Sequence, residues 1–117
     1  MFKSSYTSDE PYIPKGFAEV WDYIGSMMFS APLFRNTSPF WREDGIDVEF
    51  FGLNEGLKTI RNDVGEETYQ KLVALSDRMR AHFEADPESK NGEVIKGREL
   101  ILDMQDILKA SRKRQAR

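Results

Sequence analysis

The 117-residue chain contains no cysteine and a single histidine, His82. Without cysteine the chain has no disulfide framework, no thiolate zinc site and no cysteine nucleophile. One histidine excludes a zinc site built from several imidazoles. No apolar run approaches the roughly 20 residues that span a bilayer, and the polar N-terminus lacks the basic and apolar regions of a signal peptide. We therefore expect a cytoplasmic protein with no membrane partner.

Motifs for common enzymatic chemistry are also missing. The glycines are scattered, and no G-x-x-x-x-G-K-S/T phosphate loop is present. Met79 stands where a di-iron bundle requires a glutamate three residues before its histidine, and no nucleophile motif accompanies His82. The sequence therefore predicts a protein that is not an enzyme, needs no cofactor and holds no catalytic or metal site. His82 is expected to be structural or solvated.

The composition, with 39% hydrophobic and 32% charged residues, is that of a globular chain rather than a disordered one. The length suits a single domain, residues 1–117, which buries about two thirds of its unfolded surface. Pro11, Pro14 and three scattered aromatic residues indicate that residues 1–15 form an extended arm. We expect the aromatic side chains of this arm to pack on the body of the domain.

Four segments carry apolar residues at the spacing of one helical face, namely residues 16–31, 46–64, 66–85 and 93–111. The short link at Gly65 predicts that the second and third helices form an antiparallel hairpin. Because no segment has a strand pattern, we expect an all-α fold, a compact bundle of about four helices with an N-terminal arm. The basic residues 112–117 are expected to form a frayed tail.

Gly52 and Gly56 lie four residues apart within the second predicted helix. Each glycine costs about 1 kcal/mol relative to alanine inside a helix. Two glycines on one side remove side chains and let another backbone approach. The interpretation that we favour is close packing against the N-terminal arm or the connector at 31–45, and the alternative is a surface that a partner approaches.

Acidic residues form two groups. Glu99, Asp103 and Asp106 share one side of the fourth helix, about half a turn from its apolar face, so they are expected to form an outward stripe. The second group spans the connector and the second helix, and consists of Glu43, Asp44, Asp47, Glu49 and Glu55. Either group alone is most simply a solvated face. Together they favour a basic partner, because outside the tail 13 basic residues stand against 20 acidic ones.

Two segments resemble the immunity proteins of bacterial contact-dependent inhibition and polymorphic-toxin systems. They are Gly52 to Ser89, GLNEGLKTIRNDVGEETYQKLVALSDRMRAHFEADPES, and Lys96 to Ala110, KGRELILDMQDILKA, which together cover under half of the chain. The resemblance implies a cognate toxin, often a nuclease domain, whose active site the immunity protein binds and blocks. The family has no fixed motif of binding residues, so the resemblance assigns no residue a role.

Carboxylates can fill the role of phosphates in the basic groove of a nuclease and steer rapid association. The expected toxin-binding residues are therefore the acidic ones, with an aromatic anchor such as Trp41, Phe40 or Tyr12. On the sequence alone the aromatic residues are equally well explained as caps on a small core. Two alternatives stay open: a non-enzymatic regulatory or protein-interaction module, and, less favoured, a nucleic-acid-binding regulator that uses the basic tail.

Overall fold

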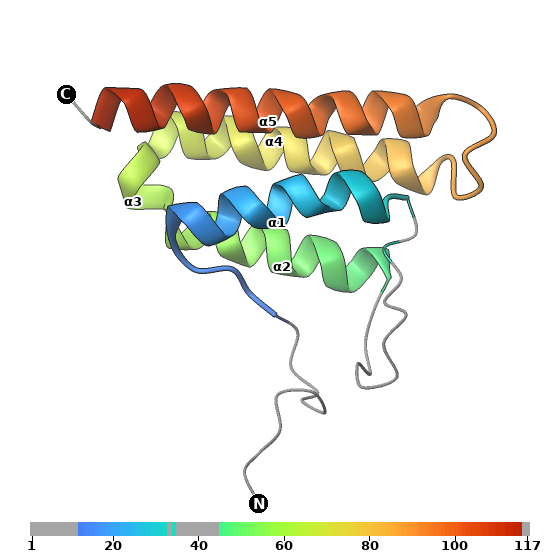
Figure 1. Cartoon of the computed structure of the whole chain (residues 1–117), viewed down its shortest axis with the longest axis horizontal. Helices are drawn as coiled ribbons and strands as arrows, with labels where there is room; N and C mark the ends of the chain where they lie inside the picture. Colours follow the sequence, from blue (N-terminus) through green and yellow to red (C-terminus); the bar gives the residue numbers. More distant parts are fainter. Residues whose placement is uncertain (1–11, 33, 35–44, 116–117) are drawn as a thin grey trace, which may run out of the picture.

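The computed structural model describes residues 12–32, 34 and 45–115. Within this part of the chain it contains five helices and no strand (Figure 1). The helices are α1 (Gly16–Ser30), α2 (Ile46–Thr59), α3 (Arg61–Val64), α4 (Glu66–Glu84) and α5 (Glu93–Gln115). The predicted all-α bundle is confirmed.

The four long helices run alternately up and down and form a bundle. α1 packs against α2 and α5, and α4 packs against the same two helices, so that α1 and α4 are diagonal neighbours. Figure 1 shows α5 and α4 lying together along one side, with α1 and α2 along the other. α3 is a single turn at one end of the bundle, between α2 and α4.

The core consists mainly of apolar side chains from one face of each long helix, together with Phe34. Phe34, from the connector after α1, lies between two helices. Its ring packs edge-to-face against Phe50 of α2, with ring centres 5.7 Å apart, and against Phe83 of α4, with ring centres 5.4 Å apart. Burial of each such large apolar side chain contributes about 1.5–3 kcal/mol. The other fully buried large side chains are Ile24, Met27, Leu53, Leu57, Ile60, Leu72, Met79, Ile101, Met104 and Leu108.

The prediction of one continuous helix over residues 46–64 is wrong. The helix ends at Thr59, Ile60 adopts φ −109° and ψ 7°, and α3 begins at Arg61. The Thr59 hydroxyl donates to the Gly56 carbonyl at 2.7 Å and accepts the Gly16 N–H at 3.0 Å. The end of α2 is thereby tied to the start of α1, a long-range contact that the local apolar spacing does not contain.

The other helix ends are close to their predicted positions. Gly65 has φ +92°, a conformation that favours glycine, and it turns the chain from α3 into α4. α5 extends to Gln115, so residues 112–115 are helical where the sequence predicted a frayed tail. The Arg112 guanidinium lies over the Phe17 ring of α1, 5.0 Å from its centre, which ties this end of α5 to the bundle.

The loop between α4 and α5 is organised by a buried carboxylate. Asp86 is 2% exposed, and its oxygens accept N–H groups from Lys90 at 2.6 Å, Asn91 at 3.2 Å and Val94 at 3.2 Å. These contacts satisfy two backbone donors of the loop and one in the first turn of α5 that has no partner within the helix. Burial raises the pKa of Asp86, but the backbone donors outweigh it and hold the pKa below its usual value.

Candidate functional site

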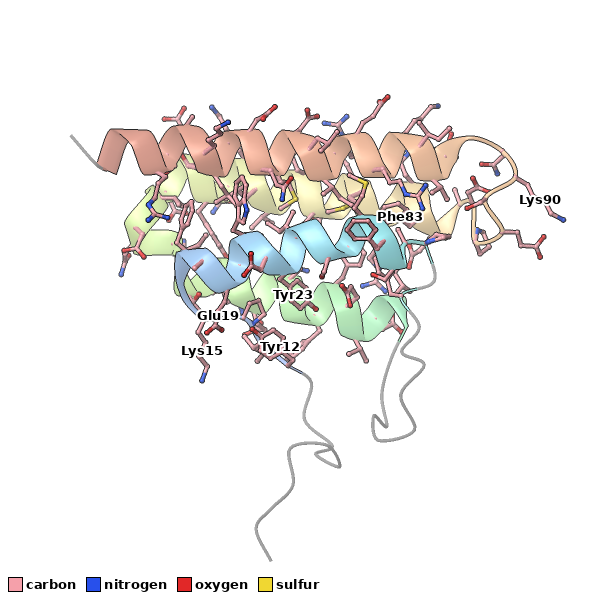
Figure 2. The ribbon with its side chains drawn as sticks, in the orientation of Figure 1. Tyr12, Lys15, Glu19, Tyr23, Phe83 and Lys90 are labelled. Carbon is pink, nitrogen blue, oxygen red and sulfur yellow. The ribbon has the colours of Figure 1, made fainter. Side chains whose placement is uncertain are left out.

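The predicted acidic stripe lies on the outer side of α5. Glu99, Asp103 and Asp106 are all exposed, and none forms a hydrogen bond or ion pair with another residue in the described part of the chain. At 1.5 Å per residue the three positions span about 10 Å along the helix. Figure 2 shows polar side chains projecting from this side of α5. The structure therefore presents three exposed carboxylates in a row, without a partner among the described residues.

Two large apolar side chains lie on the same side of α5. Ile95 is 62% exposed and Leu102 is 51% exposed. Their positions alternate along the helix with those of Glu99 and Asp106, at a spacing of three to four residues. These two residues were not predicted from the sequence, although they stand outside the apolar stripe that forms the core. This side of α5 thus combines negative charge with apolar surface, as the surfaces that bind other proteins do.

Carboxylates elsewhere on the bundle are mostly neutralised by basic neighbours. Arg61 donates to Glu66 at 2.7 Å, and Arg80 donates to Glu84 at 3.0 Å. Exposed pairs of this kind contribute at most about 1 kcal/mol each. These pairs reduce the negative charge around α4. The three carboxylates of the α5 row form no ion pair with a described residue, and the exposed Lys96 and Lys109 lie within one turn of them on the same helix.

The described residues of the second acidic group do not share one surface. Asp47 is exposed and forms an ion pair with Arg80 of α4, and Glu55 accepts a hydrogen bond from Lys58 at 2.8 Å. Glu49 instead points toward α1 and lines a hollow between the two helices. The remaining predicted partner-binding residues, Asp44 and Trp41, lie outside the described residues, as do Glu43 and Phe40.

The hollow lies between α1 and α2 and has a volume of about 460 Å³. Figure 2 shows three of its residues, Tyr12, Glu19 and Tyr23, grouped along the edge of α1 that faces α2. The complete lining is Tyr12, Glu19, Asp22, Tyr23, Ser26, Ser30 and Glu49. Apart from Glu49 and Tyr12, none of these was singled out from the sequence, because the hollow forms only when segments distant in sequence pack together.

The two helical glycines explain how the N-terminal segment reaches this hollow. A Cβ atom on Gly52 would lie 2.8 Å from the Tyr12 carbonyl oxygen, and one on Gly56 would lie 2.6 Å from Cγ of Pro14. Both distances are shorter than van der Waals contact allows. Only glycine at these two positions therefore lets the segment from Tyr12 to Pro14 pack directly on α2. The favoured interpretation, close packing against the N-terminal arm, is confirmed.

The side chain of Tyr12 makes two contacts that hold this residue against α1. Its ring stacks on Tyr23 with centres 5.9 Å apart, and its hydroxyl donates to Oε1 of Glu19 at 3.0 Å. The same Oε1 accepts the Lys15 N–H at 2.9 Å. The Lys15 N–H and the Tyr12 hydroxyl lower the pKa of Glu19. The expectation that the arm packs aromatic side chains on the body is confirmed for Tyr12; Phe2 and Tyr6 lie outside the described residues.

Glu49 is the most perturbed carboxylate of the hollow. Its backbone carbonyl accepts the Tyr23 hydroxyl at 2.8 Å, whereas its carboxylate has no hydrogen bond or ion pair with any described residue. Burial raises the pKa of Glu49 to about 7. Burial, followed by the nearby charge of Glu49, also raises the pKa of Tyr23. The hollow therefore contains a partly desolvated acid that has no compensating positive charge among the described residues.

His82 lies on the other side of the bundle. Its Nδ1 is 2.7 Å from Oε1 of Glu93, so the imidazole links α4 to the first turn of α5. Among the described residues no three His, Cys, Asp or Glu side chains are placed to hold a metal ion. No helix in the same part of the chain is sufficiently long and apolar to cross a membrane.

Comparisons with protein-family models, with curated proteins and with solved structures give no match to this chain.

Proposed function

We propose that this protein is an immunity protein, which binds a toxin domain with a basic active-site groove and blocks it. The observation that carries the proposal is the free acidic row of Glu99, Asp103 and Asp106 on α5, flanked by exposed Ile95 and Leu102. The resemblance of residues 52–89 and 96–110 to immunity proteins of bacterial toxin systems supports the same conclusion.

The charge arrangement suits a nuclease as the partner. A nuclease groove is lined with basic residues that bind phosphates, and a row of carboxylates has the complementary sign. Since the row has no basic partner in the described chain, binding breaks no ion pair of the free protein. The two aliphatic side chains add apolar contact area, which slows dissociation, while the carboxylates increase the association rate.

Co-expression with a toxin domain tests the proposal, and the partner to use is one encoded immediately upstream if the locus has it. The wild-type protein is expected to restore growth, and the triple variant E99K/D103K/D106K is expected to lose protection. With a catalytically inactive toxin, calorimetry is expected to show a Kd about 30-fold higher or more for this variant, because reversed charges oppose the basic groove.

The matched control is E67K/D77K/E88K, which makes the same change in net charge at exposed positions on α4 and the following loop. Protection by this control should equal that of the wild type. Equal loss of protection in both variants would show that net charge alone matters. Continued toxicity with an abundant, folded wild-type protein contradicts immunity toward that toxin. Binding without protection favours the alternative, a protein-interaction module.

A further inference from the structure

The hollow between α1 and α2 combines aromatic surface with carboxylates that form no ion pair with a described residue. We propose that it is a binding site for a guanidinium group, and that its occupant is an arginine side chain presented by a protein partner. This site is formed by α1, α2 and the Tyr12 segment, away from the acidic row on α5 (Figure 2). The proposal therefore does not depend on the immunity function.

The hollow has room for one side chain. Its volume of about 460 Å³ is more than a single arginine side chain needs. It opens to solvent beside Tyr12, which is 53% exposed, so a residue on the surface of a partner can enter without movement of the helices.

One wall of the hollow is aromatic. The rings of Tyr12 and Tyr23 stack at an interplanar angle of 27°, and hydrogen bonds hold both hydroxyls. A planar guanidinium packs on the face of such a ring more favourably than a compact, strongly hydrated ammonium does. The fixed rings therefore favour arginine over lysine.

Three carboxylates supply the opposite charge from two helices. Both donors to Glu19 reach its Oε1, so its Oε2 has no partner among the described residues. Asp22 and the carboxylate of Glu49 likewise have none. A guanidinium offers five N–H donors in a planar fork, which match carboxylate oxygens in pairs. The same charges exclude phosphate and other anions.

Glu49 distinguishes this hollow from an ordinary acidic surface. Its carboxylate is half-buried in the wall, and desolvation of an unpaired charge is unfavourable. Burial alone raises its pKa to about 7. A bound guanidinium removes this penalty by supplying the missing positive charge, so part of the binding free energy is already stored in the free protein.

The test is a titration of the full-length ¹⁵N-labelled protein, at pH 8, with acetyl-arginine amide as the probe. We expect saturable chemical-shift changes of the backbone amides of Tyr23, Ser26 and Glu49. The expected Kd is about 1–10 mM, because the probe supplies one side chain and none of the other contacts of a protein partner. The citrulline analogue, which has the same shape without the charge, is expected to cause no shifts. The lysine analogue is expected to bind at least about threefold more weakly.

Two variants on α2 complete the test. Glu49→Gln is expected to weaken arginine binding about fivefold or more, because it removes the half-buried charge. Glu55→Gln removes one carboxylate outside the hollow and is expected to leave the Kd unchanged. The proposal is overturned by equal shifts with citrulline, by equal affinity in both variants, or by shifts confined to α5. The proposal is also overturned if Mg²⁺ displaces the bound arginine probe as effectively as free arginine probe does, because such displacement indicates a nonspecific acidic surface. The toxin takes no part in the measurement, so failure of the immunity assay does not affect its outcome.

Discussion

Replacement of Glu49 by glutamine is expected to stabilise the protein at neutral and alkaline pH. The difference between the ordinary glutamate pKa of 4.5 and the value of about 7 in the hollow corresponds to about 3 kcal/mol. Because solvent reaches part of the carboxylate, screening reduces the expected gain to about 1–2 kcal/mol. Glutamine keeps the shape of the side chain, and the Tyr23 hydroxyl bonds to the backbone of residue 49, so this hydrogen bond is retained.

The gain depends on pH with a definite sign. Near pH 4.5 and below, Glu49 is largely protonated in the folded protein, and glutamine brings little advantage. Between pH 4.5 and about 7 the folded state binds more protons than the unfolded state, so the stability of the wild type falls as the pH rises. Above about pH 7 the full difference in the free energy of unfolding between Glu49→Gln and the wild type is present. The advantage of Glu49→Gln should therefore grow across this interval and then remain constant.

Urea unfolding followed by circular dichroism at pH 4.5, 6 and 8 measures this difference. Glu55→Gln is the matched control: it removes one exposed ion pair with Lys58, so its free energy of unfolding should change by less than about 0.5 kcal/mol. A constant advantage of Glu49→Gln at every pH, or a less stable variant at pH 8, would refute the assignment of a desolvated, unpaired carboxylate.

Two further predictions concern the contacts between α4 and α5. Gly97→Ala is expected to lower the free energy of unfolding by about 1–3 kcal/mol, because its Cβ would lie 2.7 Å from Cζ of Phe83 and nearer still to Cε1 of the same buried ring. Phe83→Leu in the same chain should recover part of the loss, as measured by chemical denaturation. Asp86→Ala is expected to lower the melting temperature by leaving the N–H groups of Lys90, Asn91 and Val94 without their acceptor. Since the pKa of Asp86 is lowered, the wild type should lose this stabilisation as the pH falls below 3.8, so a difference in melting temperature that persists unchanged at lower pH would contradict the role of the carboxylate.

Most of the helical segments, the reversal at Gly65 and the outward position of the α5 carboxylates could be predicted from the sequence alone. Residues such as Leu53, Leu57 and Ile60 repeat at the spacing of one helical face, and this local regularity is sufficient to identify the buried side. Glu99 and Asp103 lie opposite such a stripe and are therefore exposed whichever helices pack on the inner face.

The end of α2 and the pairing of the acidic residues depend instead on how the helices pack together. Asp47 and Glu49 are two residues apart on one helix, which turns by about 100° per residue, so they point in different directions. Asp47 forms an ion pair with Arg80 of α4, while Glu49 lies beside α1 and is half-buried. Both outcomes depend on helices distant in sequence. Charge alone identifies an acidic residue, but the packing of neighbouring elements determines whether that charge is neutralised, solvated or left unpaired in a hollow.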